Sequence, residues 1–128
     1  DSIYLTSAEA IELSEDQVAG LKAFVEGGGF LIFDGAETAF IASLPALLQQ
    51  LAPGATIADL PADHDLLAGE KAIYPIAEST MMGIMLDGKL IGVVTGAELG
   101  AAWAGERTAD TETAFRQGIN LVAWVLRR

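Results

Sequence analysis

The sequence predicts a single α/β domain with a mostly parallel sheet, helices on both faces and one β-hairpin. Short apolar runs, such as residues 30–33, are typical of strands buried in a parallel sheet. Amphipathic segments lie between these runs, as expected where the chain crosses from one parallel strand to the next. Asp87-Gly88 separates two further apolar runs and is the signature of a type I′ hairpin turn.

The first half of the chain alternates between strand and helix patterns. Residues 2–6 form the first expected strand, and residues 30–34 form the second, preceded by three glycines and followed by Gly35. Between them, Ser14 and Gln17 have the spacing of a capping box at the start of a helix. Residues 56–60 are expected to form a third, short strand.

Two more helices are predicted from capping residues and apolar spacing. Ser43 is expected to cap the first of them, with Pro45 in its first turn. The last helix is capped by Asp110 or Thr111. We expect its buried face to carry the apolar residues that recur at helical spacing: Phe115, Ile119, Val122 and Leu126.

Composition excludes several classes of function. The 128 residues include 18 acids and 7 bases, and the formal net charge of −11 repels phosphate backbones and anionic membranes. We therefore expect no nucleic-acid partner. No apolar stretch approaches the ~20 residues that span a bilayer, so we expect no direct membrane insertion by this segment. The chain contains no cysteine, which rules out disulfides, thiolate metal sites and a cysteine nucleophile.

A ligand site, if the domain has one, is expected at the carboxyl ends of the parallel strands, where open α/β sheets bind ligands. Asp34 ends a predicted strand and Glu37 follows it, so both carboxylates either bind a ligand there or only form the turn. Trp103 either stacks over such a site or anchors its loop. The residues expected to share this edge are Thr6, Asp34, Gly35, Glu37, Thr95, Glu98 and Trp103.

His64 is the only histidine and has an aspartate on each side. Zinc and iron sites need three or four ligands, and without a second histidine or any cysteine the remaining ligands would all be distant carboxylates. We therefore expect no structural metal and no cofactor. A serine triad is also not expected, because no serine lies in a Gly-x-Ser-x-Gly elbow.

Five segments, taken in order, carry a resemblance to a known family. They are the Tyr4-Leu5-Thr6 strand, "LSEDQVAGLKAFVEGGGFLIFD", "LPADHDLL", "GIMLDGKLIGVVTGAELGAAW" and "FRQGINLVAWVL". Together they resemble the bacterial domain of unknown function 4159. The resemblance implies the class I glutamine amidotransferase-like superfamily and its flavodoxin-like three-layer fold. It also implies one more strand and helix upstream, so residues 1–128 are expected to be one domain within a longer protein.

The sequence differs from that superfamily at residues that catalysis would require, and these differences determine which function we expect. The chain lacks the catalytic cysteine, and Thr6-Ser7-Ala8 stand where relatives often carry Gly-His-Gly, so we expect no glutaminase activity. The favoured interpretation is a non-catalytic module that binds a small molecule or protein. The resemblance places it in a larger bacterial envelope protein, periplasmic or tethered to the membrane. The alternative is a hydrolase or carbohydrate-active enzyme that uses Asp34, Glu37 and His64.

Overall fold

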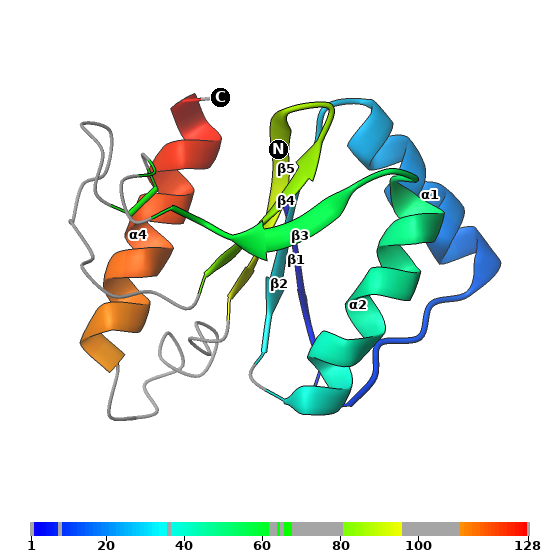
Figure 1. The fold of residues 1–128 in the computed structure, drawn as a ribbon, viewed down its shortest axis with the longest axis horizontal. Coiled ribbons are helices and arrows are strands. Elements are labelled where there is room, and N and C mark those ends of the chain that lie inside the picture. The colour runs from blue at the N-terminus through cyan, green and yellow to red at the C-terminus, as the bar shows by residue number, and fades with distance from the viewer. Residues whose placement is uncertain are drawn as a thin grey trace.

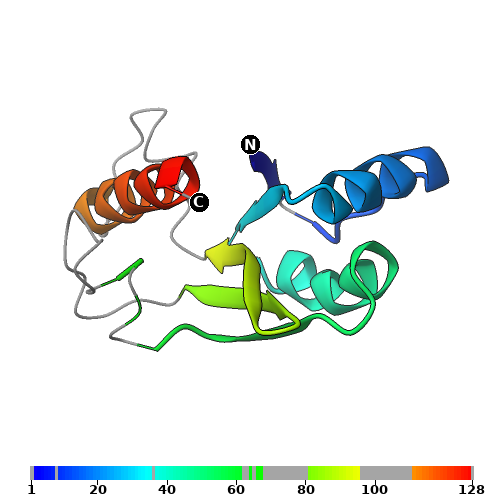
Figure 2. The ribbon, with the colours of Figure 1, turned by 90° about the horizontal axis from the view of Figure 1, so that it is seen from above.

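The protein consists of a β-sheet with helices packed on both faces. A computed structural model describes residues 2–7, 9–35, 37–61, 64, 66–67, 81–95 and 111–127; side chains are not described at 111–115 and 117. Helix α4 lies on one face of the sheet, and α1 and α2 lie on the other (Figures 1 and 2). In the described part of the chain no helix is both long and apolar enough to cross a membrane.

The sheet has five strands in the order β1-β2-β5-β4-β3. β1 pairs in parallel with β2, and β2 in parallel with β5, whereas β5 with β4 and β4 with β3 are antiparallel pairs. The expected mostly parallel layout is therefore not confirmed, because the hairpin and β3 make half of the sheet antiparallel. The strands are β1 (Ser2–Thr6), β2 (Phe30–Asp34), β3 (Thr56–Asp59), β4 (Met82–Leu86) and β5 (Lys89–Thr95).

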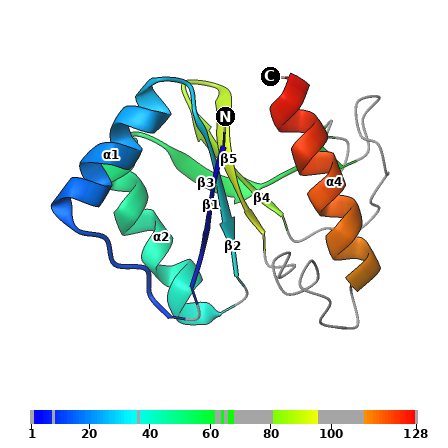
Figure 3. The same cartoon turned by 180° about the vertical axis from the view of Figure 1, so that it is seen from behind.

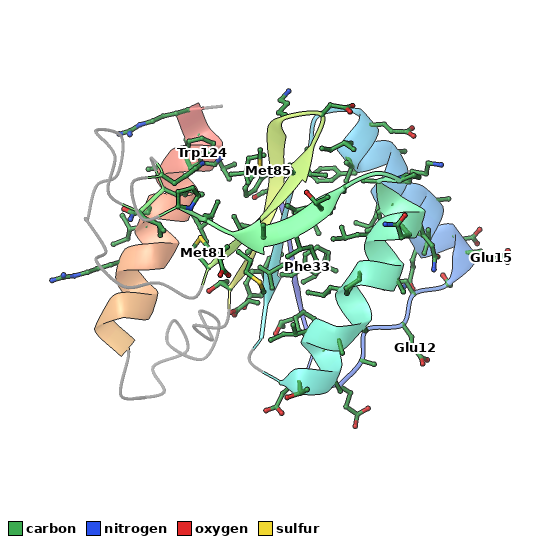
Figure 4. The ribbon with its side chains drawn as sticks, viewed as in Figure 1. Glu12, Glu15, Phe33, Met81, Met85 and Trp124 are labelled. Atoms are coloured by element: carbon green, nitrogen blue, oxygen red, sulfur yellow. The ribbon has the colours of Figure 1, made fainter. Side chains whose placement is uncertain are left out.

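Strand β2 forms the centre of the core, and all five of its residues are buried. Its side chains alternate between the two faces of the sheet. Leu31 and Phe33 pack with the cluster beneath α1 and α2, and Phe30 and Ile32 pack with the cluster beneath α4. In Figure 4, Phe33 lies on the side of α2, and Met81 lies toward α4. Burial on both faces explains why this strand is an uninterrupted apolar run.

The capping box predicted for helix α1 (Glu15–Glu26) is confirmed. The Ser14 side-chain oxygen accepts a hydrogen bond from the Gln17 amide at 3.2 Å, and the Ser14 amide donates to Gln17 Oε1 at 2.9 Å. Glu15 and Asp16 occupy the first turn, where negative charge is favoured by the helix dipole. The helix ends at the glycines, and Gly28 adopts a φ of 91° that other residues rarely adopt.

Helix α2 (Thr38–Leu51) begins earlier than predicted, so the proposed cap at Ser43 is wrong. Its N-cap is Glu37, and Ser43 and Pro45 lie inside the helix. Phe40, in the first turn, is fully buried, and this burial outweighs the disruptive effect of a proline in the helix. Ser43 serves another purpose: its hydroxyl donates to the Phe40 carbonyl at 2.6 Å and accepts from the Ile11 amide at 3.1 Å.

The hairpin is confirmed. Asp87 and Gly88 have φ angles of 52° and 76°, and positive φ at both central residues defines a type I′ turn. The pairing of β4 with β5 contains one irregularity, because Ile84 pairs with Gly92 and Met85 with Leu90. Ile91 is therefore the extra residue of a β-bulge.

Helix α4 (Thr111–Arg127) buries a different face from the one predicted. Leu121 and Ala123 are buried, and Trp124 and Val125 pack against the same cluster. The predicted face was wrong: it is exposed, with relative exposures of 41% for Ile119, 55% for Val122 and 80% for Leu126. The buried Asn120 donates from Nδ2 to the Leu66 carbonyl at 2.9 Å, and this bond helps to set the rotation of the helix. The side chain of Phe115 lies outside the described residues.

Two glycine-to-alanine substitutions should have opposite effects on stability. A Cβ at Gly92, in the centre of the sheet, would lie 2.7 Å from the Leu31 carbonyl oxygen, whereas a Cβ at Gly20 in α1 would meet nothing within 4 Å. Gly92→Ala should lower the free energy of unfolding by about 1–3 kcal/mol because the backbone must shift. Gly20→Ala should raise it by about 0.5–1 kcal/mol through helix propensity. Urea denaturation checks both values, and equal effects would contradict the described packing.

Candidate functional site

Strand pairing places three of the candidate residues side by side. Thr6 is the register partner of Asp34 in β1–β2, and Asp34 is the register partner of Thr95 in β2–β5. Each is the last residue of its strand, so all three lie at the carboxyl edge of the parallel part of the sheet. Figure 3 shows β1 and β2 running side by side toward this edge. This is the type of position at which α/β proteins commonly bind ligands.

The three side chains share the face of the sheet that α4 covers. Ile32 and Val93 belong to the cluster beneath α4. Asp34 and Thr95 follow them by two residues, and side chains two apart in a strand lie on the same face. Both are almost fully buried, with exposures of 2% and 0%, whereas Thr6 is exposed. The edge therefore combines two buried polar side chains, Asp34 and Thr95, with one exposed polar side chain, Thr6.

A residue that was not among the candidates, the exposed Tyr4, contacts the buried Asp34. Its hydroxyl donates a hydrogen bond to Asp34 Oδ2. A buried carboxylate without hydrogen bonds is costly, so this donor is part of what allows Asp34 to lie in the core. The sequence contained part of the signal, because Tyr4 and Thr6 alternate onto one face of the expected first strand. Only the register with β2 shows that this face lies beside Ile32 and Asp34. The tyrosine remains 38% exposed, which makes it the accessible end of the pair.

The residues after Asp34 have separate roles. The Gly35 amide donates to the Thr95 carbonyl at 2.9 Å and so extends the pairing of β2 with β5. Glu37 is the N-cap of α2 and is exposed, and its side chain makes no capping hydrogen bond. The two carboxylates of the 34–37 segment are therefore unlike: Asp34 is buried and bonded to Tyr4, and Glu37 faces solvent at a helix start.

Of the remaining sequence candidates, the structure describes only His64. Glu98 and Trp103 lie outside the described residues. His64 lines a hollow of about 620 Å³ together with Gly28, Lys89 and Trp124. Gly28 and Lys89 lie at the amino ends of β2 and β5, so His64 is at the opposite end of the parallel strands from Asp34.

The histidine has a local structural role. Its Nδ1 accepts a hydrogen bond from the Leu66 amide at 3.1 Å, and its ring packs on the Trp124 ring at a centroid distance of 5.4 Å. Within the described ranges, no group of three histidine, aspartate or glutamate residues is placed to hold a metal ion. The candidate site thus rests on Tyr4, Thr6, Asp34 and Thr95, with Glu37 beside them in sequence.

Fold and site together define an α/β domain in which an exposed tyrosine donates a hydrogen bond to a buried carboxylate at the carboxyl edge of the parallel strands. The model of one family, Domain of unknown function (DUF4159), matches residues 2–126, and the chain belongs to that family. No curated protein and no solved structure matches the chain. The family assignment confirms the resemblance found in the sequence and leaves the activity to be inferred from the site.

The Tyr4–Asp34 pair gives a prediction about stability. Tyr4→Phe removes a donor to a buried carboxylate and should lower the free energy of unfolding by about 1–3 kcal/mol. Asp34→Asn keeps an acceptor for the tyrosine and removes a buried charge, so it should change stability by less than about 1 kcal/mol. Chemical denaturation of both variants measures the difference. If Asp34→Asn were the more damaging change, the carboxylate charge itself would be essential to folding.

A second prediction concerns metals. The folded state should not depend on a transition metal, because the chain has one histidine and no cysteine, and zinc and iron sites are rarely built from carboxylates alone. Thermal melts of the protein with and without a chelator should coincide. A drop of several degrees with chelator, reversed by one added metal, would contradict this expectation.

Proposed function

We propose that this chain is a non-catalytic ligand-binding module on a glutamine amidotransferase-like, flavodoxin-like scaffold within a larger bacterial envelope protein. The observation that carries the proposal is the convergence of Tyr4, Thr6, Asp34 and Thr95 at the carboxyl edge of the parallel strands. Burying a polar group reduces stability unless the group is hydrogen-bonded, so polar residues are uncommon in a core, and strand ends of this kind are common ligand sites. The scaffold assignment rests on the sequence resemblance, and the α/β layering is compatible with it.

The chemistry of the site favours ligands rich in hydrogen-bond donors. Asp34 and Glu37 are carboxylates, and Thr6 presents an exposed hydroxyl. The Tyr4 hydroxyl proton is directed to Asp34, so toward any other group its oxygen acts as an acceptor. Acceptors in this number attract hydroxyl and ammonium groups and repel phosphates and carboxylates. A polyol, a sugar or an amine is therefore the expected class of ligand.

The same geometry supports binding over hydrolysis. An acid–base mechanism needs two titrating groups within reach of the reacting atoms. Asp34 is bonded to Tyr4, and Glu37 is exposed at the start of α2. His64, which the enzymatic alternative would use, lies at the other end of the strands. In this interpretation Asp34 supplies negative charge to the site and holds the Tyr4 hydroxyl, and the accessible groups of the edge contact the ligand.

The proposal predicts that binding depends on the Asp34 carboxylate although stability does not. Glucose, glucosamine and glycylglycine serve as probes of hydroxyl and ammonium binding. Titration should shift the backbone amide signals of Thr6, Gly35 and Thr95 in two-dimensional NMR spectra. Asp34→Asn should weaken binding at least about tenfold, with a melting temperature that is unchanged or raised, since binding sites often reduce stability.

A matched control comes from the antiparallel half of the sheet. Asp59 is an exposed aspartate at the end of β3, and Asp59→Asn should leave binding unchanged. Signal changes confined to the hollow around His64, or equal affinity in Asp34→Asn, would refute the strand-edge site. Release of ammonia from glutamine, or hydrolysis of a glycoside probe that is lost in Asp34→Asn, would establish the enzymatic alternative instead.

A further inference from the structure

The hollow around His64, at the amino ends of the parallel strands, has the size of a small-molecule site. Its volume of about 620 Å³ lies within the range of ~300–1,000 Å³ that is usual for ligand pockets. Helix α4 forms one wall with Trp124 and Val125, and strands β4 and β5 form the other with Met85 and Leu90. In Figure 4, Met85 on the sheet and Trp124 on α4 lie toward the same end of the molecule. Both walls are therefore largely apolar.

The polar side chains that line the hollow offer hydrogen-bond donors. His64 Nδ1 accepts from the Leu66 amide, and this bond assigns the proton of the neutral ring to Nε2, which is then a donor. Lys89 adds an exposed ammonium group that has no ion-pair partner in the described part of the chain. None of the described residues that line the hollow is acidic. A ligand there meets donors and one positive charge.

Trp124 contributes a further donor, which the described residues leave unused. Its Nε1 is shielded from water and has no hydrogen-bond partner in the described ranges. A buried donor without an acceptor is costly, and native structures contain few of them, so each one calls for an explanation. Because Trp124 lines the hollow, an acceptor bound there is a natural partner for this group.

We propose that the hollow binds a small organic acid, with its apolar or aromatic body against α4 and its carboxylate directed to Lys89 and His64. A carboxylate presents only acceptors, so it matches a polar lining made of donors. The indole of Trp124 and the aliphatic side chains beside it favour a flat, apolar body. A rotation of the indole toward the ligand gives Nε1 its acceptor. The hollow is separate from the strand-edge site, and the proposal does not depend on what that site binds.

The net charge of −11 does not decide against an anion at this place. At physiological salt, exposed charges are screened beyond about 8 Å, so the groups that line the hollow dominate. Glu26 and Asp87 line a different hollow, which Ile91 and the cluster beneath α1 and α2 place on the other face of the sheet. Asp63 and Asp65, beside His64 in the sequence, lie outside the described residues.

Ligands of similar shape and different charge test the proposal on the unaltered chain. Phenylacetate is anionic, phenylacetamide is neutral and phenethylamine is cationic. Two-dimensional NMR follows the indole N–H signal of Trp124 and the backbone amides of Gly28, Gly88 and Lys89. Phenylacetate should shift these signals with a dissociation constant below about 1 mM and bind at least about tenfold more tightly than phenethylamine. Acetate, which lacks the ring, should bind at least about tenfold more weakly than phenylacetate because it buries little apolar area.

Two charge changes at the hairpin separate the role of the ammonium group from that of the turn. Lys89→Gln should weaken phenylacetate binding at least about tenfold and change phenylacetamide binding less than about twofold, because only the anion uses the charge. Asp87→Asn is the matched control: asparagine tolerates the φ of 52° at this position, and loss of a negative charge should not weaken the binding of an anion. Circular dichroism verifies that both variants are folded.

Three kinds of result would overturn the proposal. No shift of these signals up to about 10 mM phenylacetate, or equal affinity for phenylacetate and phenethylamine, would show that the hollow does not select a carboxylate. Undiminished binding by Lys89→Gln, or an equal loss in Asp87→Asn, would refute a site in which Lys89 holds the carboxylate. Shifts confined to Thr6, Gly35 and Thr95 would place phenylacetate at the strand edge instead of in this hollow.

Discussion

The parallel pairing of β2 with both β1 and β5 is the constraint on which the rest of the structure depends. It places β2 inside the sheet, and helices on both faces then bury every one of its residues. A polar residue at the end of a strand buried in this way is shielded from water. Asp34 must find its hydrogen bonds inside the protein, and the register of β1 brings the Tyr4 hydroxyl to it. The composition of the candidate site is thus a result of strand register.

Sequence reasoning succeeded where one local pattern determined one structural outcome. The capping box at Ser14 and the turn at Asp87-Gly88 were predictable because the chemistry of a few adjacent residues decides both. The proximity of Asp34 and Thr95 followed from a rule about strand ends, once the strands had been located. The α/β class needed only the alternation of buried runs and amphipathic segments.

The incorrect predictions concern elements for which the sequence allowed two local structures and tertiary packing determined which of them formed. In α4, apolar residues occur on two sides, and the bond from Asn120 to the Leu66 carbonyl favours the side with Leu121. No periodicity in the sequence identifies that bond. Pro45 normally indicates the start of a helix. In α2, the burial of Phe40 favours a helix that begins earlier, at Thr38, on the N-terminal side of this proline. Tyr4 was missed because its role depends on the register of another strand.

The pairing of β2 with β5 also has a consequence for the order of folding. Asp34 and Thr95 are about sixty residues apart in the chain, whereas β4 and β5 are joined by a two-residue turn. Closing the longer loop costs more chain entropy, so contacts of high sequence separation are gained late. The antiparallel half of the sheet can therefore nucleate from its hairpin, while the polar edge assembles only as the parallel half closes. We therefore expect Asp34 and Thr95 to come together only after the hairpin has formed.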